Sequence, residues 1–312
     1  MIPYSFSTEK PGGWDAFCAR QSLFFGSTEW LSTLESSFGC RTIYAWNGSD
    51  GAAISVFRAG PFSIGYLGFP AGIITANGTT LEGVLRQLAE SRSTRRLTGA
   101  RVIVSGFSNC PRFDYPCVAN PETAITDLQE WDLMGVSKNL RRDIRKAARS
   151  GLVVRRIDDP EFGPALFGFY ANTVKRHGGS LRYNSSYYSS LLELARSGRT
   201  VQVYLAELDS DPVGFAVIAR HADTAYYLHG ATSEGARHLS PSDLILSEAL
   251  RAEREAGCKK FNFMASPGDQ PTLVRYKEKW GGDTRTQRTY TIGMSAAFPL
   301  FRAAEKLYRL VT

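Results

Sequence analysis

Eight basic side chains and a single acidic one, Asp143, occupy the short stretch from Lys138 to Arg156. The basic residues are Lys138, Arg141, Arg142, Arg145, Lys146, Arg149, Arg155 and Arg156. This stretch has a net charge of +7, which equals the formal charge of the whole chain, so charges balance elsewhere. Cations this closely spaced suit a polyanion: RNA, a phosphorylated substrate or an anionic membrane surface. The alternative is a solvated helix face without a partner.

A second group of chemically interesting residues lies near the carboxyl end, in the segments FNFMASPGD and LVRYKEKWGG. The pattern predicts a strand that ends at Met264, a loop, and a short helix that stops at the glycine pair. Tyr276 and Trp280 share one face of that helix because they are four residues apart. Lys277 lies beside them and, taken alone, is expected to be a surface lysine. If the packed face holds its backbone, its ammonium can instead stabilise a developing oxyanion.

Several motifs of common enzymes are absent. No Gly-x-Gly-x-x-Gly follows a predicted strand, and no Walker loop, nucleophile elbow or His-Glu-x-x-His occurs. The four histidines, His177, His221, His229 and His238, lack metal-ligand spacing, so we expect no metal. The sequence therefore argues against dehydrogenases, kinases, classical hydrolases and metalloproteases. His229, at the end of a predicted strand, suits a structural role better than a ligand.

Composition predicts an ordinary globular protein. Of 312 residues, 43% are hydrophobic and 21% charged, a length that suits two domains. No apolar stretch is long enough to cross a membrane, and the start, MIPYSFSTEK, lacks a basic leader and an apolar core. We therefore expect a cytoplasmic protein. The five cysteines, an odd number without a Cys-x-x-Cys pair, argue against a disulfide framework.

The basic stretch reads as a helix. Ser137 is a plausible N-cap, and Gly151 suits the left-handed residue that ends a helix. Leu140, Ile144 and Ala147 fall on one face, which leaves the arginines on the other. Placing the boundary at this helix gives a first domain over 1–135 and a second over 136–312.

The two halves have the same predicted order of elements at an offset of about 160 residues. In the first half we expect a helix at 28–37, strands at 42–46, 52–58 and 64–69, a helix at 80–91 and a strand at 101–105. In the second we expect helices at 164–176 and 186–197, strands at 201–207, 213–220 and 225–230, a helix at 243–256 and a strand at 260–264. This order predicts a duplicated α/β unit, in which an antiparallel meander is followed by a crossover helix and a returning strand. The fold class is therefore a mixed, mostly antiparallel sheet flanked by helices.

Four segments resemble the Fem family, the aminoacyltransferases that build peptidoglycan bridges within the GNAT acyltransferase superfamily. They are KNLRRDIRKAARSGLVVR, LRYNSSYY, YYLHGAT and FNFMASPGD with YKEKWGG. The first half matches less well: Ser27, Glu29 and Trp30 fit a family pattern, but Gly26 replaces its glutamine. The coiled-coil arm that some family members have is missing. The family's first-domain lysine, which binds the acceptor, has no clear counterpart in this sequence. The resemblance implies tandem GNAT-like domains, in agreement with the repeat.

The resemblance also implies roles for particular residues. Tyr276 and Lys277 match a pair that contacts the 3′ end of aminoacyl-tRNA and the reacting ester. Arg182, with Tyr183 and Tyr187 beside it, matches an arginine that binds acceptor phosphates. Further candidates for substrate binding are Tyr227, His229 and Ser266, and candidates for contacts with tRNA phosphates are Arg141, Arg142, Arg145 and Lys146.

The activity implied is transfer of an aminoacyl group from aminoacyl-tRNA to an amine of a phosphorylated, peptide or cell-wall-precursor acceptor, with no permanently bound cofactor and no DNA partner. The coenzyme A loop of GNAT enzymes is absent, since ATSEGARHLSPSD follows Gly230 and provides no glycine-rich nest for a pyrophosphate. One alternative is an acyl-CoA-dependent N-acyltransferase that modifies a small-molecule or envelope amine. Another is a non-catalytic protein that binds RNA or an anionic membrane surface on the same scaffold.

Overall fold

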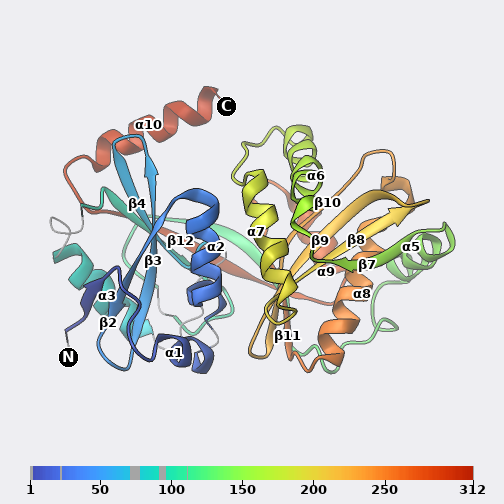
Figure 1. Cartoon of the computed structure of the whole chain (residues 1–312), viewed down its shortest axis with the longest axis horizontal. Coiled ribbons are helices and arrows are strands. Elements are labelled where there is room, and N and C mark those ends of the chain that lie inside the picture. The colour runs from blue at the N-terminus through green and yellow to red at the C-terminus, as the bar shows by residue number, and fades with distance from the viewer. Residues whose placement is uncertain (1–2, 22, 71–77, 91–95, 111, 312) are drawn as a thin grey trace. The chain divides into compact units, whose positions relative to one another are not determined.

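The computed structural model describes residues 3–21, 23–70, 78–90, 96–110 and 112–311, which form two units (Figure 1). Unit 1 consists of Met1–Asn120 together with Arg285–Thr312, and unit 2 consists of Pro121–Thr284. Each unit has its own run of neighbouring strands and its own hydrophobic core.

Unit 1 is a mixed sheet in the strand order β1-β2-β3-β4-β5-β12. Its elements are β1 (Ser5–Ser7), α1 (Trp14–Arg20), α2 (Thr28–Phe38), β2 (Arg41–Trp46), β3 (Gly51–Ala59), β4 (Phe62–Leu67), α3 (Gly78–Glu90), β5 (Gly99–Val104), β12 (Asp283–Gly293) and α10 (Phe298–Val311). Strands β1 to β4 are antiparallel neighbours, and α3 carries the chain to β5, which is parallel to β4. Alternating apolar residues such as Ile43, Ile54 and Val102 fill the core between sheet and helices.

Unit 2 repeats this plan in the strand order β6-β11-β10-β9-β8-β7. Its elements are β6 (Cys117–Ile125), α5 (Lys138–Arg149), β7 (Val153–Ile157), α6 (Gly163–Arg176), α7 (Ser185–Arg196), β8 (Val201–Leu208), β9 (Asp211–His221), β10 (Thr224–Thr232), α8 (Pro241–Glu255), β11 (Lys260–Ala265) and α9 (Pro271–Glu278). Strands β7 to β10 form the antiparallel meander, and α8 leads to β11, which is parallel to β10.

The predicted duplication of the meander is confirmed. The hairpins β2–β3 and β8–β9 stand at the same place in the two strand orders, and each is followed by a third antiparallel strand, a helix and a parallel strand. The mixed, mostly antiparallel sheet flanked by helices is also as predicted.

The division of the chain differs from the predicted boundary between residues 135 and 136. Strand β12, late in the chain, pairs with β5 and belongs to unit 1 from Arg285 onward. Strand β6, which directly precedes the basic helix, pairs with β11 of unit 2 from Pro121 onward. Strand β6 follows β5 of unit 1 in sequence but completes the strand order of unit 2. Strand β12 follows β11 of unit 2 in sequence but completes the strand order of unit 1. Helix α5 lies inside unit 2 instead of marking a boundary.

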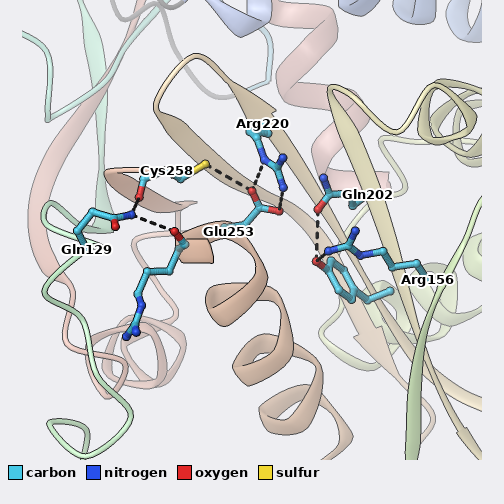
Figure 2. Close-up of polar contacts among 8 residues, drawn as sticks. Gln129, Arg156, Gln202, Arg220, Glu253 and Cys258 are labelled. Carbon is cyan, nitrogen blue, oxygen red and sulfur yellow. Dashed lines mark hydrogen bonds and ion pairs between the residues drawn. The ribbon is translucent and has the colours of Figure 1, made fainter. Parts of the chain in front are cut away.

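A buried ion pair fastens α8 to the sheet of unit 2 (Figure 2). The Arg220 guanidinium on β9 donates to both carboxylate oxygens of Glu253, at 2.5 and 3.0 Å, and Glu253 is fully buried. The Cys258 thiol also donates to this carboxylate, and burial raises the pKa of the thiol to about 12. Because both carboxylate oxygens have partners, the buried charge of Glu253 is compensated, and the ion pair holds α8 against β9.

The end of α8 is tied in turn to the segment after β6. The Gln129 amide donates to the Cys258 carbonyl at 2.7 Å (Figure 2), and Arg254 donates to the Trp131 carbonyl at 2.6 Å. The Trp131 indole N–H then donates to the carbonyl of Trp280 at 2.8 Å. The rigid sheet–helix junction is thereby connected to the residues that follow α9.

No helix in the described part of the chain is both long and apolar enough to span a membrane.

Candidate active site

The parallel ladder between β10 and β11 ends early. It consists of three pairs, which join Thr224–Tyr226 to Lys260–Asn262, although both strands continue further. On β10 a bulge follows between Tyr227 and His229. In unit 1 the equivalent ladder of β4 and β5 continues to Leu67, the last residue of β4. Unit 2 therefore has a strand end that unit 1 lacks, where backbone groups leave the ladder.

At this end β11 turns sharply at Met264. Its φ of 64° lies in the left-handed region, which side chains other than glycine rarely adopt. The Asn262 side chain holds the turn, since its carbonyl oxygen accepts from the Met264 N–H at 2.7 Å and its amide donates to Glu122 on β6 at 2.7 Å. The pairing of β11 with β6 shifts register over these residues. This irregularity in β11 leaves the carbonyls of Met264 and Ala265 outside the parallel ladder of β10 and β11.

Lys277 of α9 binds these two carbonyls. Its Nζ donates to Met264 O at 3.0 Å and to Ala265 O at 3.3 Å. The residue is 4% exposed, so the expectation of a surface lysine is wrong. Burial lowers the pKa of the ammonium to about 7, and the Glu122 carboxylate opposes this shift. A lysine with a pKa near neutrality can act as a cation and can also exchange a proton.

Tyr276, the preceding residue, joins α9 to α8. Its hydroxyl donates to Oδ1 of Asp243 at 2.8 Å. Burial raises the pKa of Asp243, while the hydrogen bond from Tyr276 lowers it. Asp243 lies in the first turn of α8, where Pro241 supplies no N–H and Ser240 makes no side-chain cap. A carboxylate at this helix start takes the favourable position for negative charge and disfavours a pyrophosphate there.

The glycine pair after α9 is required by a left-handed backbone conformation at Gly281 and by close packing at Gly282. Gly281 has a φ of +87°, and a Cβ at Gly282 would lie 2.8 Å from the Thr123 side chain of β6. Trp280 is fully buried and packs in the same core as Tyr276, so the predicted shared face is confirmed. The carboxyl end of α9 is therefore fixed against β6, and with it the backbone of Lys277.

An aromatic cluster lies on α7 and on the bulged end of β10. The Tyr187 hydroxyl is 2.9 Å from Nε2 of His229, and the Tyr183 ring stacks on Tyr187 with centroids 4.7 Å apart. Burial lowers the pKa of His229 to about 3, so the imidazole is neutral near pH 7. Tyr188 is fully buried, and its hydroxyl has no hydrogen-bond partner among the described residues.

Of the remaining predicted substrate-binding residues, Tyr227 lies on β10, Ser266 lies just after the end of β11, and Arg182 lies on the surface. Tyr227, on the bulge, lies close to Gly230, where a Cβ would come within 1.9 Å of the tyrosine hydroxyl, so that a larger residue at 230 would displace the Tyr227 ring. Ser266 follows β11 and is buried, with its N–H on the Pro121 carbonyl at 2.8 Å and its hydroxyl unpaired within the described part of the chain. Arg182 is exposed, and its backbone N–H donates to the hydroxyl of Tyr170 at 2.9 Å.

The structure thus brings Tyr183, Tyr187 and His229 into one cluster and places Tyr276 and Lys277 next to each other on α9. Sequence reasoning missed Glu122, Asn262 and Asp243. A polar Asn262 between two phenylalanines of a buried strand was the available signal for one of them.

The basic helix α5 has the predicted orientation. Ser137 caps it by accepting from the Leu140 N–H, and the face containing Ile144 and Ala147 is buried. A surface hollow lies on the other side and is lined by Arg142, Arg145, Lys146, Arg149 and Ser150. Arg141 does not line the hollow; its guanidinium contacts the sulfur of Met134 at 3.6 Å. Arg149, absent from the predicted contacts, takes its place.

Among the described residues, no group of three or more His, Cys, Asp or Glu side chains is arranged to hold a metal ion.

Comparisons with known proteins agree with this architecture. Residues 135–278 match the model of the acetyltransferase (GNAT) domain. A crystal structure of FemX superimposes with a TM-score of 0.67 at 15% identity, over 95% of this chain and 99% of FemX. The C-terminal domain of a protein assigned as a lysylphosphatidylglycerol synthetase from Agrobacterium fabrum gives a TM-score of 0.60 at 17% identity, over 91% of each chain. A tandem GNAT protein of the clavulanic acid biosynthesis pathway gives 0.53 at 15% identity, over 82% of this chain and 83% of its own.

A search of curated protein sequences finds no match. The predicted fold is confirmed by the structural similarities. The domain match covers β10, β11 and α9, where the strand ladder ends and Lys277 binds the freed carbonyls. The protein is accordingly an acyltransferase of the GNAT fold, similar in structure to FemX.

Proposed function

We propose that the protein transfers an aminoacyl group from aminoacyl-tRNA to an amine of a phosphorylated, peptide or cell-wall-precursor acceptor. The observation that carries this proposal is the hollow on α5, which gathers the cations of Arg142, Arg145, Lys146 and Arg149 on one helix. Cations spaced along a helix match the regularly spaced phosphates of a nucleic acid backbone. The tRNA backbone would bind this surface while its charged 3′ end reaches Lys277.

The start of α8 supports a donor other than acyl-CoA. In a helix that binds pyrophosphate, free N–H groups and a positive helix end face the anion. Here Pro241 removes one N–H, and Asp243 brings a carboxylate into the first turn. A second negative group at this position would be repelled.

The reaction assigns distinct tasks to the residues of the site. The acceptor nitrogen attacks the ester carbonyl, a C–N bond forms, and the bond from the carbonyl carbon to the ribose oxygen breaks. The Lys277 ammonium would stabilise the tetrahedral oxyanion and give a proton to the departing ribose oxygen. The proton lost by the attacking nitrogen then restores the ammonium. Arg182 and the ring of Tyr183 would bind the acceptor, through charge and through stacking.

The structural relatives favour an acceptor from the cell envelope. FemX and the protein assigned as a lysylphosphatidylglycerol synthetase both share this fold over more than nine-tenths of the chain. The name of the second relative specifies a lysyl group joined to a lipid, which is the class of product that an aminoacyltransferase would make.

A transfer assay tests the proposal. The purified chain is given either tRNA charged with a labelled amino acid mixture or labelled acyl-CoA, with cell-wall precursors, aminolipids and simple amines as acceptors. Transfer of label from tRNA, and its competition by uncharged tRNA, would support the proposal. Transfer from acyl-CoA alone, or no transfer from charged tRNA to any acceptor, would overturn it. A Lys277→Met variant controls for uncatalysed ester aminolysis.

The second candidate is an acyl-CoA-dependent N-acyltransferase. The match of residues 135–278 to the acetyltransferase domain favours it, as does the similarity to the tandem GNAT protein of the clavulanic acid biosynthesis pathway. The acyl-CoA arm of the same assay decides between the two donors.

A further inference from the structure

We propose that Glu122 is a positioning residue that keeps the Lys277 ammonium charged and directed toward the reacting carbonyl. The inference rests on the proposed function only in the role it gives to Lys277, because it concerns the state of that side chain in the protein without substrate.

Glu122 reaches the lysine site through a short chain of contacts. It lies on β6, is 1% exposed, and is the ladder partner of Ala265, whose carbonyl accepts from Lys277. Its carboxylate accepts the 2.7 Å hydrogen bond from Asn262, and Asn262 accepts from the N–H of Met264. Glu122 therefore supports, through one amide side chain, the left-handed turn whose carbonyls hold Nζ.

The same carboxylate supplies charge. A buried ammonium that has only carbonyl partners tends to lose its proton, because desolvation disfavours the charged form. Glu122 is the acidic group whose field opposes this loss at Lys277. Burial raises the pKa of the Tyr226 hydroxyl on β10, and the field of Glu122 adds to this rise. The acid on α8, Asp243, is bound by Tyr276 instead.

These two contributions can be separated by substitution. Glu122→Gln keeps an oxygen for the Asn262 amide but removes the negative charge, so the pKa of Lys277 should fall below its value of about 7 in the parent. Asn262→Ala leaves the charge and removes the tie to Met264, so the carbonyls that hold Nζ lose their fixed direction. The first change should act on protonation and the second on geometry.

The test measures both the lysine and the rate. NMR of the full chain with 13C-labelled lysine reports the Lys277 pKa without substrate, and Lys277→Met assigns the signal. In Glu122→Gln the pKa should fall by about one unit or more, and the alkaline limb of the rate profile should move with it, so that the rate above that pKa falls about tenfold per unit. Glu122→Asp, which keeps the charge, should restore part of both. In Asn262→Ala the maximum rate should fall without an equal shift of the limb.

Glu253→Gln is the matched control, since Glu253 is an equally buried carboxylate of unit 2 that pairs with Arg220. It should lower stability and leave the Lys277 pKa unchanged. A folded Glu122→Gln variant with the parental Lys277 pKa and rate profile would overturn the proposal. If the Gln variant does not fold, Asn262→Ala decides, and a parental maximum rate in that variant would overturn the proposal. Because the NMR readout needs no donor, failure of the tRNA assay would leave this result standing.

Discussion

The hydroxyl of Tyr276 donates to Asp243 at 2.8 Å and so joins the helix that carries Lys277 to the first turn of α8. The contact links two elements that are separated in sequence by a loop, a strand and the Met264 turn. It also satisfies a carboxylate whose pKa burial raises. The position of the lysine thus depends on α8 as well as on β6.

Tyr276→Phe removes this hydrogen bond and leaves the Asp243 carboxylate without its donor. The variant should lose about 1–3 kcal/mol of unfolding free energy near pH 7. The pKa of Asp243 should rise further, and a carboxyl with a raised folded pKa destabilises the fold only where it is ionised. The difference from the parent should therefore shrink as the pH falls through that pKa. Urea unfolding of both proteins at about pH 7 and about pH 5 measures this; an equal loss at the two values would contradict it.

Lys277→Met should abolish most activity and stabilise the protein. Loss of an electrostatic donor to the oxyanion typically costs about 100–1,000-fold in rate. Because the folded pKa of Lys277 is about 7, below its ordinary value, the unfolded chain binds the proton more tightly. Parental stability should therefore fall as the pH drops from about 10 to about 7 and then level, by at most about 5 kcal/mol. The Met variant should lack this slope in denaturant unfolding, and a variant with parental turnover would refute the catalytic role.

Reversal of charge on α5 should weaken tRNA binding. Replacing Arg142, Arg145 and Arg149 by Glu removes three cations from the hollow. For each tRNA phosphate that no longer binds a cation, the slope of log affinity against log salt should decrease by about one unit. The control reverses Arg196, Arg199 and Arg251, three exposed arginines of the same unit that lie off this helix, and it changes the net charge equally. If binding isotherms of the two triple variants agree at low salt, α5 is a solvated face.

His229→Gln should flatten the acid side of the stability profile. The folded pKa of His229 is about 3, well below its ordinary value, because the imidazole is desolvated next to Tyr187. The unfolded chain therefore takes up the proton first, and parental stability should decline as the pH falls below about 6.5. Glutamine can keep a hydrogen bond to the Tyr187 hydroxyl but does not titrate. Thermal unfolding between about pH 4 and about pH 7 compares how the stability of the two proteins changes with pH. Parallel slopes would show that the folded pKa of His229 is not lowered.

The meander strands were predictable because their signal is local. Apolar residues alternate within β2, β3, β8 and β9, and turn residues flank these strands. The predicted bounds agree with the structure to within a few residues. Strands β6 and β12 were not predicted. The first contains Pro121 and the second is rich in Thr and Arg. Their ladder partners, such as Phe261 for Ile125, lie more than a hundred residues away, and local sequence contains no information about such a pairing.

The site was predictable to the level of single residues and not to that of their environment. Tyr276 and Lys277 were identified through resemblance to a family, and their shared helix is as expected. The burial of Lys277 was not foreseen, because the groups that compensate it come from β6 and from the turn of β11. A lysine in an isolated helix gives no sign that a carboxylate such as Glu122 will face it from a distant strand.

Strand β12 is made after the strands of unit 2 but belongs to unit 1, whereas β6 is made before the other strands of unit 2 and belongs to that unit. The two units are therefore completed in a set order as the polypeptide grows. When β5 has left the ribosome, the strand that covers its free edge is still about 190 residues from being made, which corresponds to about 10–40 s of translation. Unit 2 faces no such delay, because β6 precedes β11 and its sheet is complete once β11 is made. The nascent chain therefore finishes its second unit before its first, and the uncovered edge of β5 is the surface that a chaperone must protect or that a neighbouring chain can capture.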